Sequence, residues 1–193
     1  MIRLRKLEPS DLPFLYQWEN DSSAWADSDT HNPLSRQDLR AYIESTTGDI
    51  YRDGQLRLMI CEDAPSVEDS IGAIDAHNVQ TPQKTHSPSS TTIGCIDLFD
   101  FDVRNRKAAI GMYVAPEARR RGVGHEAVRQ LLRYAFDFLH LRMVYAIVRV
   151  TNEPSSCVYK DLGFIPSAVL HNWVLEGDAV VWQKCCQPIT DPR

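Results

Sequence analysis

Apolar residues recur along this chain with two different spacings, and each spacing predicts its own kind of element. Alternation of apolar and polar residues is typical of a half-buried strand, whereas a repeat of three to four residues is typical of an amphipathic helix. The pattern predicts strands at residues 2–5, 56–61, 93–101, 108–114, 144–150, 171–175 and 179–184. It predicts helices at residues 12–20, 36–44, 123–139 and 152–162.

Three segments carry the strongest patterns. Residues 123–139 place their apolar side chains on one helical face, which predicts a broad contact with a sheet. Residues 144–150 form a nearly unbroken apolar run rich in β-branched residues, which predicts a strand buried on both sides. Residues 63–92 follow neither spacing, and residues 78–92 contain two prolines and a single aliphatic residue. They predict a flexible insertion, because such a segment buries too little apolar surface to offset its ordering entropy.

Local signals mark the ends of two helices. Ser35 precedes the helix at 36–44, and Asp38 lies at the third helical position, which predicts a short version of the capping box. Thr151 and Asn152 are the predicted caps at the start of the helix at 152–162, with Pro154 in its first turn. Gly163 follows it, and a glycine there is suited to the left-handed conformation that ends helices.

Composition narrows the class of protein. The chain has 193 residues, which predicts one domain, 1–193, with a full core. A net charge of −5 gives no global basic field, so we expect no nucleic-acid partner. No run of about 18 apolar residues and no hydrophobic leader follow the N-terminus, so we expect a soluble, cytoplasmic protein without a membrane partner.

The number and spacing of the five cysteines also favour the reducing cytoplasm. Their number is odd, no C-x-x-C pair occurs, and no histidine lies at zinc-ligand spacing, so we expect neither a disulfide framework nor a metal site. Cys61, Cys95 and Cys157 lie in apolar patterns, where a free cysteine behaves as a small core residue.

One loop joins an apolar strand to the most regular helix. It contains Arg119, Arg120 and Arg121, then Gly122 and Gly124. Unpaired N–H groups and the positive end of the dipole make a glycine-rich helix start an anion site, so a phosphate or pyrophosphate fits there. The spacing is neither that of a Walker loop nor the full dinucleotide fingerprint. A solvated basic turn remains the alternative for this loop taken alone.

Two motifs in order give this sequence a family resemblance. The first is Arg119-x-x-Gly122-x-Gly124, and the second is Asn152-x-x-Ser155-x-x-Val158-Tyr159-x-x-x-Gly163-Phe164. Together they resemble the pyrophosphate loop and the C-terminal motif of the GNAT N-acetyltransferase superfamily. The opening R-L-R-x-L-E-x-x-D-L and the C-terminal hairpin look like the branch that holds spermidine and ribosomal-protein N-terminal acetyltransferases. The resemblance covers the chain except for residues 63–92.

The resemblance implies a fold and a cofactor site. The fold is a single-domain α/β (α+β) acyltransferase fold, with a mixed, mostly antiparallel sheet, helices on both faces and strands that splay where acetyl-CoA enters. Residues 112–114 would pair with the pantetheine arm, residues 119–126 would hold the pyrophosphate, and the start of the last helix would lie beside the pantetheine. The implied cofactor-binding residues are Met112, Tyr113, Val114, Arg119, Arg120, Arg121, Gly122, Val123, Gly124, His125, Glu126, Asn152 and Ser155.

The implied reaction is direct attack of a primary amine on the thioester. Tyr159 would donate its proton to the departing thiolate, since an ordinary tyrosine is protonated at neutral pH. The alternative is a helix tyrosine that only covers the core. Asp97 aligns with a strand carboxylate of the polyamine enzymes and is a candidate base, although a water relay or a solvent-facing aspartate fits equally well. Cys157 has no predictable cationic partner, so we do not expect a cysteine nucleophile.

The acceptor side is expected to be acidic. Glu19, Asp21, Asp27 and Asp29 follow the first helix, and carboxylates there would attract a small cationic amine such as a polyamine. A basic protein N-terminus is the second candidate, and a solvated loop is the alternative for this segment. Two further classes stay open: an acetyl-CoA-binding module without turnover, and an unrelated nucleotide-binding domain. The exposed C-terminal hairpin also predicts a homodimer or a higher homo-oligomer.

Overall fold

The computed structural model describes residues 1–23, 25, 32–63, 90–174 and 177–186. Asp27 and Asp29 lie outside these ranges, as does most of the expected insertion at 63–92. The described residues contain no helix long and apolar enough to cross a membrane.

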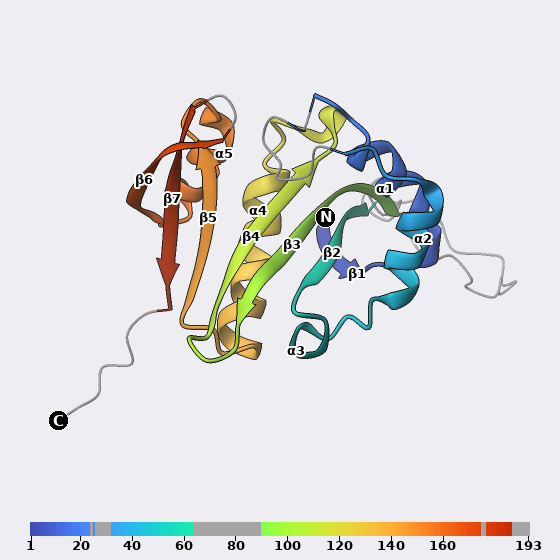
Figure 1. The fold of residues 1–193 in the computed structure, drawn as a ribbon, viewed down its shortest axis with the longest axis horizontal. Coiled ribbons are helices and arrows are strands. Elements are labelled where there is room, and N and C mark those ends of the chain that lie inside the picture. Colours follow the sequence, from blue (N-terminus) through green and yellow to red (C-terminus); the bar gives the residue numbers. More distant parts are fainter. Residues whose placement is uncertain (24, 26–31, 64–89, 175–176, 187–193) are drawn as a thin grey trace, which may run out of the picture.

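Seven strands in the described part of the chain form one sheet (Figure 1). In spatial order they are β1 (Ile2–Lys6), β2 (Leu56–Asp63), β3 (Ser90–Asp102), β4 (Lys107–Val114), β5 (Met143–Arg149), β7 (Gly177–Cys185) and β6 (Ile165–Val174). Only β4 and β5 run parallel, and all other neighbours are antiparallel. The predicted mixed, mostly antiparallel sheet is therefore confirmed.

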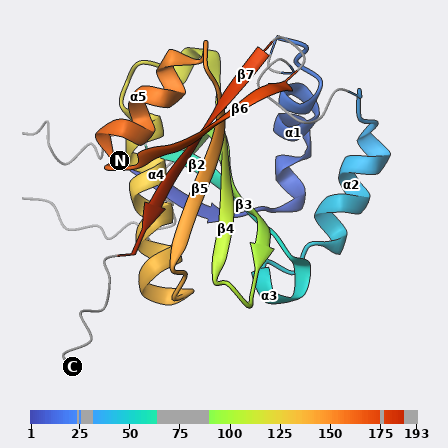
Figure 2. The same cartoon turned by 60° about the vertical axis from the view of Figure 1, so that its left-hand side comes forward.

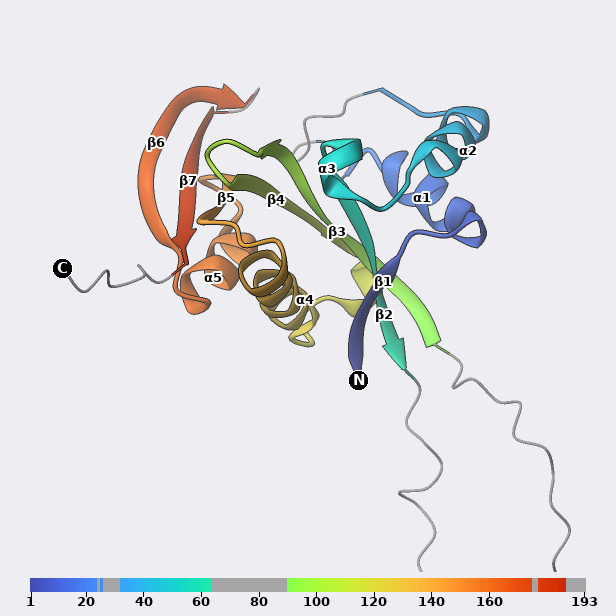
Figure 3. The ribbon, with the colours of Figure 1, turned by 90° about the horizontal axis from the view of Figure 1, so that it is seen from below.

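Helices cover both faces of this sheet, as Figures 2 and 3 show from two directions. One face carries α1 (Leu12–Glu19) and α2 (Arg36–Ser45), and the other carries α4 (Val123–Arg133) and α5 (Glu153–Asp161). The shorter elements are η1 (Pro9–Asp11), α3 (Ile50–Asp53), η4 (Pro116–Ala118) and η5, a π-helix at Tyr134–Phe138 that continues α4.

The two faces bury separate hydrophobic clusters. The α4 side packs helix residues such as Val128 and Leu131 against Ile96, Leu98 and Ile110 of the sheet. The α1–α2 side packs helix residues against Met59, Cys61 and Cys95 of the same strands. Successive strand residues point to opposite faces, so the side of each functional side chain follows from its position in the strand.

The predicted helix ends are confirmed. Ser35 Oγ accepts a hydrogen bond from the Asp38 amide at 3.1 Å, and the Asp38 carboxylate accepts from the Ser35 amide at 3.1 Å. Asn152 caps α5, and Gly163 after it has a φ of 76°. Both helices thus begin and end where short-range chemistry places them.

Three structural expectations were wrong. β5 is not buried on both sides, because Ile147 is 42% exposed while Val144 and Val148 are buried. Cys157 is exposed, since it faces away from the core side of α5. β6 begins at Ile165 rather than at 171. β6 is an edge strand exposed along almost its whole length, so alternation does not reveal it.

β4 and β5 separate halfway along their length. Their pairing consists of Lys107 with Met143, Ala108 with Val144, and Ala109 with Tyr145. Beyond Ala109 the two strands diverge, which Figure 1 shows as the widening gap between them. This is the predicted splay, and it leaves one edge of β4 unpaired from Ile110 to Val114 within the described sheet.

Candidate active site

The unpaired edge of β4 presents backbone groups of alternate residues. The Tyr113 carbonyl faces β3, because a Cβ added at Gly94 of β3 would lie 2.3 Å from that oxygen. The Ala115 amide also faces β3 and donates to the Ile93 carbonyl at 2.9 Å. Since backbone groups alternate along a strand, those of Met112 and Val114 face the opening. Of the three expected residues, Tyr113 is thus paired with β3 and only two face the splay.

The loop after β4 presents a row of donors. Arg120 and Gly122 both have left-handed backbone angles, with φ of 61° and 78°. α4 begins after Gly122 without a side-chain cap, and its first backbone bond runs from Glu126 to the Gly122 carbonyl. The amides of residues 123–125 therefore have no partner in the described part of the chain, and they lie at the positive end of the helix dipole.

The three arginines of the loop have different surroundings. Arg119 Nε donates to the Val114 carbonyl at 2.9 Å, and its guanidinium lies 5.7 Å from the centre of the Tyr113 ring. Arg121 pairs with Glu62 of β2 at 2.5 Å. Arg120 forms no ion pair with any described residue. Arg119 likewise has no carboxylate partner among the described residues, so Arg119 and Arg120 are the arginines of this loop whose charges are available to an anion.

The side chains of His125 and Glu126 both have partners on the protein. His125 Nε2 lies 3.0 Å from Asp161 of α5. Glu126 accepts a hydrogen bond from Gln130 at 2.9 Å and also pairs with Arg129, and the Gln130 bond is the main reason that the pKa of Glu126 is lowered. His125 thus connects α4 to α5, whereas Glu126 pairs within α4 itself.

Gly124 brings the two sequence motifs together. A Cβ at this position would lie 3.0 Å from Met112 Cε of β4 and 3.7 Å from Val158 Cγ2 of α5. The loop, the open strand edge and the helix that carries Tyr159 therefore meet at one point. A larger residue at 124 would occupy the space between them.

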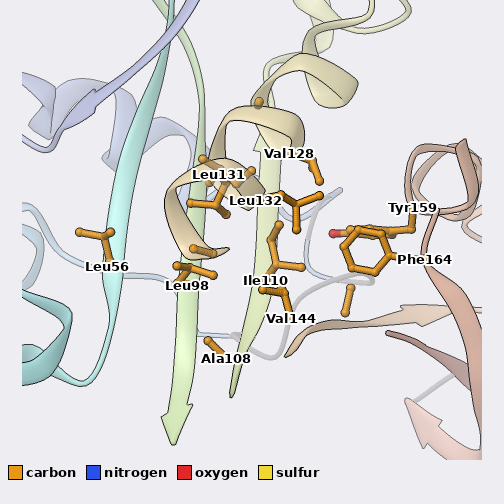
Figure 4. Close-up of a cluster of buried hydrophobic side chains, with 14 of the residues drawn as sticks. Leu56, Leu98, Ala108, Ile110, Val128, Leu131, Leu132, Val144, Tyr159 and Phe164 are labelled. Carbon is orange, nitrogen blue, oxygen red and sulfur yellow. The ribbon is translucent and has the colours of Figure 1, made fainter. Parts of the chain in front are cut away.

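Tyr159 lies on α5, and its hydroxyl points into the hydrophobic cluster on the α4 side of the sheet. Its ring packs edge-on against Phe164 with centroids 5.0 Å apart, and its residue is only 4% exposed. Figure 4 shows the hydroxyl directed toward Ile110, Val128 and Leu132. No hydrogen bond of this hydroxyl is formed with the residues that the structure describes, and burial alone raises the pKa of Tyr159 well above its ordinary value. The group is a protonated donor at neutral pH.

Asn152 and Ser155 are engaged in the helix cap. Asn152 Oδ1 accepts a hydrogen bond from the Ser155 amide at 3.1 Å. The second motif therefore begins with a structural contact that fixes the start of α5, and Tyr159 follows about two turns after Asn152.

The α1–α2 side of the splay holds a group of ionised side chains. Asp97 of β3 accepts two hydrogen bonds from Arg57 of β2, at 2.8 and 2.9 Å, and Glu19 of α1 accepts one at 2.6 Å. Each side chain is about one-fifth exposed. Asp97 does not join the cluster of Ile96 and Leu98, and it pairs instead with Arg57 of β2. Across the β3–β4 ladder Asp97 faces Gly111, which lies within the segment of β4 whose other edge is open.

Sequence reasoning missed Arg57. Its signal was a single cation inside the apolar run of residues 56–61, since a charged side chain in a central strand needs a partner of opposite charge. The carboxylates that could supply this partner lie far away in sequence, so their identity emerges only in the fold.

Asp21 lies near Tyr113 on the same side. It accepts hydrogen bonds from the Ser23 hydroxyl and amide at 2.7 and 3.0 Å, and these contacts lower the pKa of Asp21. Burial, followed by the charge of Asp21, raises the pKa of Tyr113, whose ring packs against Trp18 with centroids 5.3 Å apart. Glu19 and Asp21 are thus brought to this side, while Asp27 and Asp29 lie outside the described residues.

Comparison with known sequences gives a family and two relatives. Residues 2–165 match the family described as "Acetyltransferase (GNAT) domain". The chain is 40% identical over 72 residues to the Bacillus subtilis (strain 168) protein named "Putative ribosomal N-acetyltransferase YdaF", which covers 37% of this chain and 39% of that protein. It is 27% identical over 85 residues to the spermidine N(1)-acetyltransferase of Escherichia coli (strain K12), which covers 44% and 46%. The chain thus spans less than half the length of these relatives.

Solved structures share the fold. The spermidine N-acetyltransferase from Vibrio cholerae in complex with CoA and spermine superposes with a TM-score of 0.75 at 18% identity, covering 95% of both chains. A dodecameric structure of the Vibrio cholerae enzyme in an intermediate state gives a TM-score of 0.67 at 20% identity, covering 95% of this chain and 93% of that one. At these identities the likeness establishes the architecture.

Proposed function

Because this chain belongs to the GNAT acetyltransferase family, we propose that it transfers the acetyl group of acetyl-CoA to a primary amine by direct attack. The observation that carries this proposal is the meeting of three parts at Gly124: the open β4 edge, the uncapped start of α4 and the helix of Tyr159. Acetyl-CoA has a group for each part: its amides suit the open strand edge, its pyrophosphate suits the start of α4, and its thioester suits the hydroxyl of Tyr159.

The residues fit acetyl-CoA as a substrate. The free amides of residues 123–125 and the guanidinium groups of Arg119 and Arg120 would bind its pyrophosphate. Met112 and Val114 would pair with the amides of the pantetheine arm as an added strand does. Arg119 also donates through Nε to the Val114 carbonyl, which fixes the strand end against the loop. A strand amide at the opening would also donate to the thioester oxygen as negative charge develops there.

In the proposed reaction the amine nitrogen bonds to the thioester carbon and the carbon–sulfur bond breaks. The acceptor ammonium loses one proton to water before it attacks and a second proton as the amide forms. Tyr159 gives its proton to the departing sulfur and regains one from solvent, so one proton is released in total. Both oxygens of Asp97 accept hydrogen bonds from Arg57, which favours a proton path through water over direct abstraction by this carboxylate. Asp97 would then attract the acceptor ammonium electrostatically.

For the acceptor we favour a polyamine or another small cationic amine. Glu19, Asp97 and Arg57 together carry one net negative charge on the acceptor side. The amino terminus of a ribosomal or other basic protein is the second candidate, and it is supported by the name of the Bacillus subtilis relative. An acetyl-CoA-binding module without turnover is the alternative of another class, and the retention of Tyr159, with its hydroxyl kept protonated, argues against it.

Thiol release from acetyl-CoA tests this proposal. The wild-type protein is expected to release thiol with spermidine, and more slowly or not at all with a lysine-rich octapeptide that has a free amino terminus. Faster release with the peptide would favour the second candidate. Binding of acetyl-CoA without thiol release for any amine would contradict the transferase proposal and favour the binding module.

We further propose that the protein is a homodimer or a higher homo-oligomer that uses the edge of β6. This strand pairs only with β7 in the described sheet, and Ile165, Val169 and Trp173 are exposed on it. An unpaired strand with apolar side chains is stabilised when another strand covers it. Light scattering is expected to give at least twice the chain mass of 22.0 kDa, and Trp173→Glu is expected to shift the protein toward the monomer. A wild-type mass of one chain at micromolar concentration would contradict this proposal.

A further inference from the structure

Arg57 is a cation in the middle of the sheet, placed between the end of α1 and the strand that precedes the open edge. Its guanidinium spans two elements: the Nε and Nη2 groups bind both oxygens of Asp97, and Nη1 binds Glu19. It also lies 5.5 Å from the centre of the Tyr42 ring of α2. One side chain thus joins β2, β3, α1 and α2.

The two carboxylates keep capacity for a further donor. Each oxygen of an ionised carboxylate can accept about two hydrogen bonds, and Arg57 uses one on each of three oxygens. The remaining oxygen of Glu19 has no partner among the described residues. The group as a whole carries one net negative charge, which matches a single ammonium.

The residue after Glu19, Asn20, fixes the end of α1 to the segment that contains Leu34. Asn20 comes directly after Glu19, its carboxamide donates to the Tyr16 and Leu34 carbonyls at 2.8 and 3.0 Å, and its oxygen accepts from the Leu34 amide at 2.9 Å. Glu19 is therefore held in two ways. Arg57 of the sheet binds its carboxylate, and the hydrogen bonds of the neighbouring Asn20 side chain fix its backbone. Its carboxylate has a fixed position relative to Asp97.

We propose that Arg57 is a positioning residue for the amine acceptor, holding Asp97 and Glu19 in the one arrangement in which their remaining lone pairs bind an ammonium group. This inference rests on the proposed function and extends it to a residue that acts through its two partners. Arginine suits the role because its planar fork fixes both oxygens of Asp97, which a lysine cannot do.

The charge state of the cluster is consistent with this role. Burial is the largest single influence and acts to lower the pKa of Arg57, but the charge of Asp97, its hydrogen bonds and the other nearby groups together outweigh burial, and the pKa lies well above the ordinary value. Without this cation, Glu19 and Asp97 would repel each other and lose their shared orientation.

A second arginine in the same sheet provides a matched control. Arg5 of β1 binds both oxygens of Asp11 at 2.6 and 2.7 Å, and Asp11 is 1% exposed at the start of α1. Arg57→Lys and Arg5→Lys therefore each remove a guanidinium that connects α1 to the sheet. Arg5 binds at the start of the helix and Arg57 binds at its end. Only Arg57 lies on the acceptor side.

The experiment compares acceptor KM, acetyl-CoA KM and melting temperature for the three proteins, together with calorimetric titration of spermidine and of the lysine-rich octapeptide in the presence of CoA. Arg57→Lys is expected to raise the acceptor KM and weaken binding of the same probe about tenfold, with the acetyl-CoA KM within about twofold of wild type. Arg5→Lys is expected to lower the melting temperature and leave both KM values within about twofold.

Equal changes of acceptor KM in both variants would overturn the proposal, because the effect would then follow stability alone. A change confined to the acetyl-CoA KM would overturn it as well. If the wild type releases no thiol, the transferase proposal fails, and the calorimetric titration still decides the role of Arg57. Weaker probe binding in Arg57→Lys alone would keep that role, whereas equal binding by all three proteins, or none by the wild type, would overturn it.

Discussion

Replacing Tyr159 by phenylalanine is expected to lower kcat about 100-fold while the protein still folds and still binds acetyl-CoA. General acid catalysis by one side chain contributes roughly 10² to 10⁴ in rate, and the hydroxyl is the only group that this substitution removes. The hydroxyl forms no hydrogen bond with the described residues, so its loss leaves no other polar group unsatisfied. The ring contact with Phe164 is retained.

Tyr51→Phe is the matched control for this measurement. Tyr51 lies on α3, away from the opening, and its hydroxyl donates to the Leu139 carbonyl at 3.3 Å. It is expected to keep kcat within about twofold of wild type. If Tyr159→Phe keeps more than half of the wild-type kcat, the acid role is contradicted and Tyr159 is a core residue.

The pH dependence gives the same assignment an independent check. The acid form of Tyr159 is the active one, and burial raises its pKa above the ordinary value of about 10. Wild-type kcat is therefore expected to show no loss from this group up to about pH 10. A fall in kcat between pH 8 and 9 that disappears in Tyr159→Phe would contradict the raised pKa.

Gly94→Ala is expected to destabilise the fold by about 3 kcal/mol, at the upper end of the range for overpacked sites. The added Cβ would lie 2.3 Å from the Tyr113 carbonyl oxygen and 3.2 Å from the Val114 Cα. Both contacts are with backbone, so no side chain can rotate away, and β4 itself has to move. Thermal unfolding is expected to show a fall in Tm of roughly 10 °C for a chain of this size.

Gly54→Ala is the control that distinguishes the effect of a steric clash on stability from the effect of an unfavourable backbone conformation. Gly54 has a φ of 70°, and nothing lies within 4 Å of the position that a Cβ would take. The substitution is expected to cost only about 1 kcal/mol, through the left-handed conformation. Equal losses in the two variants would show that close packing at Gly94 is not what requires a glycine there.

The features predicted well are those encoded within a few residues. The start of α4 follows from Gly122 and its neighbours, and the start of α5 follows from Asn152 and Pro154, because caps act on amides two or three positions away. The family resemblance is confirmed over residues 2–165, since its two motifs are both local and ordered along the chain. The contact of both motifs at Gly124 follows from their shared neighbour β4.

The features missed are those that depend on what lies across the sheet. Arg57 meets Asp97 and Glu19 only after β2, β3 and α1 are assembled, and the three residues are far apart in sequence. The exposure of Ile147 depends on what covers that face of β5, which the composition of β5 cannot reveal. The pairing of Tyr113 with β3 depends on the register, where a shift of one residue exchanges the two edges.

The short pairing between β4 and β5 divides the sheet into two plates joined along a seam of three residue pairs. One plate is β1 to β4 with α1 and α2, and the other is β5, β7 and β6 with α5. A seam this short contributes few backbone hydrogen bonds, so the two plates are held together mainly by the shared hydrophobic cluster beneath α4, in which Val144 and Val148 of β5 pack. A molecule bound along the open part of the seam would contact both plates and hold them together, so binding of the substrate would also stabilise the fold.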